Sequence, residues 1–123
     1  MGYKVIGTTV YLTRGDTLRL KVNIMQEQPD GTKEEYIPQE GDAVRFAVKK
    51  DIYKGVKYTE LEDVDPLIIK SIPIDTLILE LEPGDTKGLP FGMYLYDVEL
   101  TMADGTVDTF ITDAKFWLKV EVH

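Results

Sequence analysis

The sequence predicts an all-β protein, built as an antiparallel β-sandwich of about 7–9 strands. Three observations carry this prediction. Apolar and polar residues alternate at period two in nearly every patterned segment, while no window of a dozen residues repeats at helical spacing. Clusters of Gly, Pro and Asp separate these segments at short intervals. Residues 81–98 hold two alternating strands joined by a corner rich in Pro and Gly, which is typical of a strand crossing between sheets.

The first half of the chain is expected to hold three strands that face a core. One strand covers residues 5–13, and the next, after Gly15, alternates through Leu18, Leu20, Val22 and Ile24. Residues 26–35 form a turn centred on Pro29-Asp30-Gly31, since Pro fixes φ and Gly accepts positive φ. A short strand could follow around Tyr36 and Ile37. A further core strand covers residues 43–50, with these residues inward: Val44, Phe46 and Val48.

The second half begins with an unpatterned stretch, residues 51–65, which we interpret as a long surface loop of one single domain spanning residues 1–123. Five strands are then expected, over residues 67–72, 76–82, 92–102, 107–111 and 114–122. Asp104-Gly105 predicts a tight hairpin between the third and fourth of these. The last strand places four residues inward, Phe116, Leu118, Val120 and Val122, and three outward, Trp117, Lys119 and Glu121.

The corner itself resembles the one between the late strands of immunoglobulin-like sandwiches. There, an acidic residue precedes a strand whose buried Tyr hydroxyl bonds back to the corner backbone. In this sequence Asp85 is the acidic residue, and either Tyr94 or Tyr96 could supply the hydroxyl. Both tyrosines are expected to face the core. The fold class is therefore predicted more closely as an immunoglobulin-like antiparallel β-sandwich.

Composition excludes several classes of function. The net charge of -8 and the lack of a basic stripe argue against a nucleic-acid partner. The chain has no Cys, so it has no disulfide and no thiolate metal site, which fits a reducing cytoplasm. Neither a secretory signal nor an apolar run of about twenty residues is visible, so we expect no membrane association.

No catalytic constellation is apparent, and we expect a protein without enzymatic activity, cofactor or metal. The single His, His123, lies at the chain end, and the single Ser, Ser71, lies in a strand. Arg14-Gly15-Asp16 matches an integrin-binding tripeptide, but the similar Gly41-Asp42 favours a turn at both places. The acidic run in the long loop could bind Ca²⁺, although its spacing matches no EF-hand and a solvated loop is the simpler interpretation: Glu60, Glu62, Asp63 and Asp65.

Apolar side chains on the outward face of the late strands are the candidate interface. If Tyr94 and Tyr96 point inward, then Met93, Leu95 and Trp117 project from the other face, and Phe110 could join them. A contiguous apolar group on one sheet face indicates a binding surface. The alternative is that the long loop or the N-terminal segment covers these residues.

From Leu12 to Val122, the order of these signals resembles the small immunoglobulin-like proteins of phages and prophages of Gram-positive bacteria, and is similar to the N-terminal domain of baseplate upper proteins. The matching segments are residues 14–20, 44–50, 81–92, 94–100 and 103–106. The resemblance implies a virion structural or accessory protein of the tail or baseplate, present in the bacterial cytoplasm during assembly.

Such a protein would dock to itself or to other virion proteins, and a homo-oligomer is expected. No receptor-binding or coiled-coil region follows in this chain, which departs from that family's pattern. The alternative function is a carbohydrate-binding β-sandwich, in which exposed aromatic rings stack on sugars: Trp117, Tyr53 and Tyr58.

Overall fold

Strands make up most of the chain in the computed structural model, which describes residues 3–51 and 66–120. The all-β prediction is confirmed. The strands are β1 (Tyr3–Ile6), β2 (Thr9–Thr13), β3 (Leu18–Lys21), β4 (Met25–Glu27), β5 (Lys33–Glu35), β6 (Ala43–Lys50), β7 (Ile68–Ile72), β8 (Ile78–Leu81), β9 (Gly92–Thr101) and β10 (Val107–Lys119). One short helix, α1 (Pro83–Lys87), lies between β8 and β9.

The largest sheet has the strand order β1-β2-β10-β9-β6-β7. Its strands pair antiparallel except for β2 and β10, which run parallel with Val10 opposite Phe116. The prediction of a wholly antiparallel arrangement is wrong at this pair. Because half-buried strands alternate at period two in either direction, alternation in the sequence does not specify strand direction.

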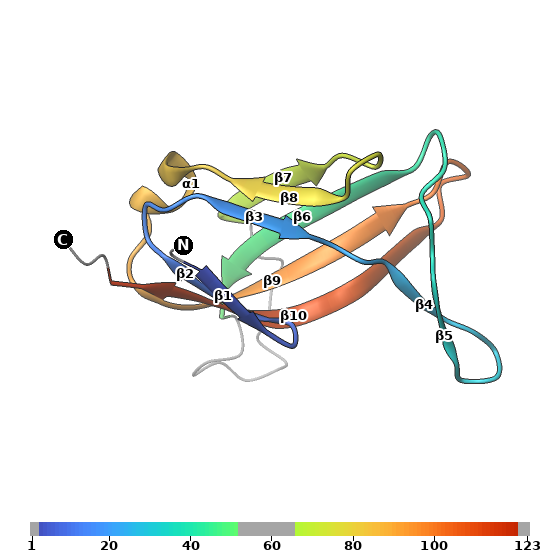
Figure 1. Cartoon of the computed structure of the whole chain (residues 1–123), viewed down its shortest axis with the longest axis horizontal. Coiled ribbons are helices and arrows are strands. Elements are labelled where there is room, and N and C mark those ends of the chain that lie inside the picture. The colour runs from blue at the N-terminus through green and yellow to red at the C-terminus, as the bar shows by residue number, and fades with distance from the viewer. Residues whose placement is uncertain (1–2, 52–65, 121–123) are drawn as a thin grey trace, which may run out of the picture.

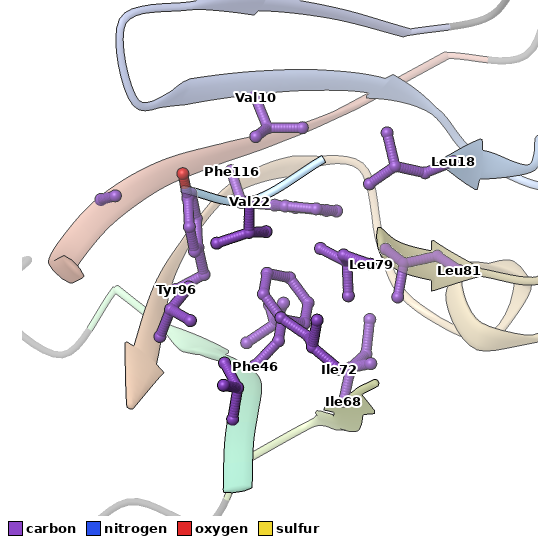
Figure 2. Close-up of a cluster of buried hydrophobic side chains, with 14 of the residues drawn as sticks. Val10, Leu18, Val22, Phe46, Ile68, Ile72, Leu79, Leu81, Tyr96 and Phe116 are labelled. Carbon is purple, nitrogen blue, oxygen red and sulfur yellow. The ribbon is translucent and has the colours of Figure 1, made fainter. Parts of the chain in front are cut away.

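A second, two-stranded sheet lies over one face of the large one (Figure 1). It pairs β3 with β8 antiparallel, with Leu18 opposite Leu81. Side chains from both sheets converge between them (Figure 2). Three aromatic rings lie at the centre of this core, with centroid separations of 5.4–6.4 Å: Phe46, Tyr96 and Phe116. Their edge-on and tilted contacts add to the stabilisation from burying apolar surface.

A third small sheet, formed by β4 and β5, projects from one end of the molecule (Figure 1). Its turn is the predicted one, with Gly31 at φ 87° and the Asp30 carboxylate accepting hydrogen bonds from Thr32. The flanking residues form a strand pair rather than loop. The short strand considered around Tyr36 and Ile37 does not form. Instead, the Tyr36 amide donates to the Ile24 carbonyl and its hydroxyl donates to Asp42.

Two predicted strand boundaries are wrong, because a residue with positive φ or a register shift changes the course of the backbone there. Residues 5–13 are not one strand, because Gly7 at φ 60° reverses the chain and makes β1 and β2 a hairpin. Residues 107–119 form one strand instead of two, because β10 absorbs two register shifts and Asp113 adopts φ 51°. Beyond it, Val120 is 61% exposed rather than inward. Glu121 and Val122 lie outside the described residues.

The corner between β8 and β9 contains a helical turn that the sequence analysis did not predict. Pro83 occupies the first turn of α1, and the Asp85 carboxylate accepts a hydrogen bond of 2.7 Å from the Glu82 amide. Asp85 also pairs with Lys70 of β7 at 2.9 Å. The buried Thr86 hydroxyl accepts the Gly15 amide at 2.9 Å, which joins the corner to the turn before β3.

Both corner tyrosines are buried, and they bond to different segments. Tyr94 donates its hydroxyl to the Pro90 carbonyl at 2.6 Å, so Tyr94 makes the expected bond back to the corner. Tyr96 donates instead to the carbonyl of Thr8, in the turn between β1 and β2. Burial raises the pKa of both phenols above the usual value. The two hydroxyls therefore hold two turns against the core.

Candidate functional site

The face of the large sheet that points away from the core carries a continuous row of side chains across four strands. Strand register places Lys4 opposite Tyr11, Tyr11 opposite Trp117, and Trp117 opposite Met93. Their chain neighbours Val10 and Phe116 are buried in the core, which fixes the row on the opposite face. Trp117 is 38% exposed, while Tyr11 and Met93 are half-buried. We call Lys4, Tyr11, Trp117 and Met93 the outer row.

Lysine ammonium groups surround the aromatic part of the outer row. Lys4 and Lys119 lie 5.4 and 5.9 Å from the Tyr11 ring centroid, in cation–π geometry. Lys115 is exposed on the same strand face, two residues before Trp117. Within residues 3–51 and 66–120, no carboxylate forms a salt bridge with these three lysines. The part of this face around Tyr11 and Trp117 is therefore basic, although the chain carries a net charge of -8.

The structure brings Met93 and Trp117 together as expected, but it places Leu95 and Phe110 differently. Leu95 lies on the outer face and is only 5% exposed, so the expectation that it is available to a partner is wrong. Phe110 packs against the core rather than beside Trp117. Phe110 lies six positions before the buried Phe116 on the same strand, so period-two alternation along β10 already favours the core side for Phe110.

A charged cluster lies beside Leu95 on the same face. Lys49, opposite Leu95 in register, places its Nζ 3.0 Å from an Asp97 oxygen and 2.8 Å from an Asp113 oxygen. Partial burial alone would lower the pKa of Lys49, but the two carboxylates outweigh it and the pKa is raised. The second Asp97 oxygen accepts the Asp113 amide at 2.7 Å. The cluster thus holds the irregular part of β10 against β9 and β6.

The Arg14-Gly15-Asp16 tripeptide is a turn whose arginine is engaged within the fold. The Arg14 guanidinium donates to the Leu89 carbonyl at 3.2 Å and stacks 4.0 Å from the Phe91 ring centroid. Gly15 has φ 85°. These contacts give Arg14 a structural role at this turn.

The remaining candidates divide between described and undescribed residues. Ser71 is exposed on β7, the edge strand of the large sheet. Among the described residues, no three His, Cys, Asp or Glu side chains come together as a metal-binding group. The other candidates lie outside the described residues: the loop over 52–65, Tyr53, Tyr58, Glu60, Glu62, Asp63, Asp65 and His123.

Two members of the outer row, Lys4 and Tyr11, were missed from the sequence. A signal for Tyr11 is readable in the sequence, because Val10, Tyr11 and Leu12 alternate and Val10 and Leu12 are buried, but the sequence analysis did not use it. Its place beside Trp117 depends on the parallel pairing of β2 with β10, which no local pattern signals. The facing of Tyr11 could thus have been predicted from the sequence, whereas its neighbour Trp117 could not.

Within the part of the chain that the structure describes, no helix has the length and apolar character needed to cross a membrane. Comparisons of the chain with protein-family models, curated proteins and solved structures found no match.

Proposed function

We propose that this chain is an immunoglobulin-like β-sandwich that works as a non-enzymatic assembly module through protein–protein contacts. Three features support the immunoglobulin-like part. A two-stranded sheet lies over a larger one, β2 runs parallel to β10 beside the antiparallel β9, and the Tyr94 hydroxyl closes the corner before β9. The order of sequence signals supports a phage or prophage virion, of the tail or baseplate type, as the setting.

The exposed outer row is the observation that carries the functional proposal. Trp, Tyr and Met are enriched in protein interfaces, and Trp is the residue that most often dominates their binding energy. Here Trp117 is 38% exposed between Tyr11 and Met93, on the regular face of a sheet. A rigid strand backbone holds all three side chains, so a partner would meet a largely pre-organised surface.

Sedimentation velocity of the chain, alone and mixed with the products of the flanking genes, tests this proposal. We expect association with itself or with a tail-assembly neighbour, and Trp117→Ala should weaken Kd roughly 30-fold, since an interface hot spot contributes about 2 kcal/mol. Ile78→Ala is the matched control, because Ile78 is a 40% exposed strand residue in the other sheet. Association that is absent for the wild type, or equal in both variants, contradicts the proposal.

A carbohydrate-binding module is the second candidate, favoured by the same aromatic pair. Tyr11, which is half-buried, and Trp117, which is exposed, are neighbours on a sheet face, and aromatic rings there could stack on sugar rings. Binding of the monomeric protein to cell-wall glycan, lost in Trp117→Ala and retained in Ile78→Ala, would favour this function. Glycan binding with no protein partner would replace the assembly proposal.

A further inference from the structure

The β4–β5 hairpin is acidic, exposed and self-contained. Residues 25–40 carry five acidic side chains against the single Lys33: Glu27, Asp30, Glu34, Glu35 and Glu40. All five are exposed. Among the strands that the structure describes, these two pair only with each other, in the register Met25–Glu35 to Glu27–Lys33. Met25 and Ile37 are 42% and 61% exposed, so the hairpin also offers apolar contacts near its base.

The hairpin and the outer row have opposite charge and lie in different parts of the molecule. The outer row is surrounded by Lys4, Lys115 and Lys119, whereas the hairpin is acidic. Figure 1 shows the hairpin projecting at one end of the long axis, with β1 and β2 toward the other end. A hairpin that projects away from the body cannot cover the outer row of its own chain, but it can reach the row of another copy.

We propose that copies of this chain associate head to tail, with the acidic β4–β5 hairpin of one copy bound on the basic outer row of the next. The inference rests on the proposed assembly function and names its partner as a second copy. Charge complementarity selects this contact, because a symmetric contact between two outer rows would bring together six lysines that form no salt bridge within residues 3–51 and 66–120. Met25 and Ile37 supply apolar contacts for Trp117 and Met93.

This contact is heterologous, since it joins two different surfaces. Repetition of such a contact closes into a ring if the rotation between copies allows, and otherwise extends as a filament. Either product leaves every interior copy with both surfaces occupied. The association should weaken steeply with added salt. At physiological ionic strength the Debye length is about 8 Å, so attraction between solvent-exposed charges farther apart than this is largely screened.

Charge exchange tests the inference on the full chain. Glu27→Lys with Glu34→Lys changes the net charge of the hairpin itself, residues 25–35, from -3 to +1. Lys115→Glu with Lys119→Glu changes the summed charge of Lys4, residue 115 and residue 119 from +3 to -1. Each double variant alone should self-associate more than about tenfold more weakly than wild type, because like charges then face each other. Mixed together, the two variants should regain association within about threefold of wild type, because every hairpin again meets a row of opposite charge.

Asp16→Lys with Asp75→Lys is the control for net charge. It makes the same change in charge as the hairpin variant at exposed positions outside both surfaces. It should associate like wild type, and far-UV circular dichroism confirms that each variant is folded.

The outcomes separate this inference from the proposed function. Loss of association in Trp117→Ala, with no effect of either charge-reversed pair, would overturn the head-to-tail contact and leave the assembly function standing. A wild-type chain that stays monomeric at low salt, yet binds a different protein through Trp117, would also overturn the head-to-tail contact and leave the assembly function standing. Failure of the mixed variants to associate, although each is folded, also overturns the hairpin-on-row contact.

Discussion

The buried hydroxyl of Thr86 offers the sharpest test of how the corner is held. Thr86 is 0% exposed, and its oxygen accepts the Gly15 amide at 2.9 Å. Thr86→Val replaces that oxygen with a methyl group of nearly the same shape. The variant therefore removes the hydrogen bond without opening a cavity.

The expected loss of stability in Thr86→Val comes from the Gly15 amide, which is left without its acceptor. The Gly15 amide is half-buried in a turn with φ 85°, so it keeps its position but loses its acceptor. A lost hydrogen bond with an unsatisfied, partly buried donor costs about 2 kcal/mol. With a urea m-value of about 2 kcal/mol/M for a domain of this size, the unfolding midpoint should fall by about 1 M.

Thr86→Ser is the matched control. It keeps the oxygen and removes one buried methyl group, which costs about 1 kcal/mol. Urea unfolding followed by far-UV circular dichroism compares the two variants with wild type. A Thr86→Val protein as stable as Thr86→Ser would show that the hydroxyl does not hold the corner to the Gly15 turn, and would refute the reasoning.

Two further predictions concern charged groups. Lys49→Met should lower the free energy of unfolding by about 2 kcal/mol in urea titrations, because Asp97 and Asp113 are left as neighbouring, partly buried carboxylates. Lys115→Met, on the same face but exposed, should change it by less than about 0.5 kcal/mol, and equal effects would contradict a role for the cluster. The Gln39 amide and the Tyr36 hydroxyl hold the pKa of Asp42 below its usual value, so its stabilisation is complete above the unfolded pKa of about 3.9 and is lost as pH falls through the folded pKa. Asp42→Asn should therefore reduce the fall in stability between about pH 5 and pH 3 relative to wild type, and an unchanged pH profile would exclude Asp42 as its source.

Local sequence patterns predicted the regular core strands well. The alternation of Val44, Phe46 and Val48 placed β6 at its observed residues, and these side chains are buried. Asp104-Gly105 predicted the β9–β10 hairpin, where Gly105 has φ 92°. In both cases the structure is determined by a short stretch of sequence. For β6 it is the alternation that buries one face, and for the hairpin it is the glycine at the turn.

The missed features depend on contacts between distant residues or on single backbone angles. Phe110 was misplaced because residues 107–111 were predicted as a strand separate from 114–122, whereas both belong to β10, where Phe110 and Phe116 both contact the core. Leu95 is buried although it lies outside the core cluster, and its alternation gave no sign of this. The α1 turn had a readable signal in Glu82-Pro83-Gly84-Asp85, since Pro suits a first helical turn and an acidic residue three positions after the cap can bond back to it.

The candidate site was predicted in part. Trp117 and Met93 follow from alternation alone, whereas the basic surroundings require the strand order. Lys4 and Lys119 are far apart in sequence and reach the same Tyr11 ring only because β1 and β2 join the sheet beside β10. The sequence analysis predicted a turn at residues 26–35, but it did not predict that these residues form a separate two-stranded sheet that projects from the rest of the molecule.

The parallel pairing of β2 with β10 has a consequence for how the chain folds. Residue 10 pairs with residue 116, so this part of the sheet has a high contact order. During synthesis the β1–β2 hairpin emerges early and has no partner strand until β10 has also emerged. We therefore expect folding in the millisecond-to-second range typical of proteins dominated by non-local strand pairing. Until β10 arrives, the unpaired edge of β2 is the segment most exposed to misassembly between nascent chains.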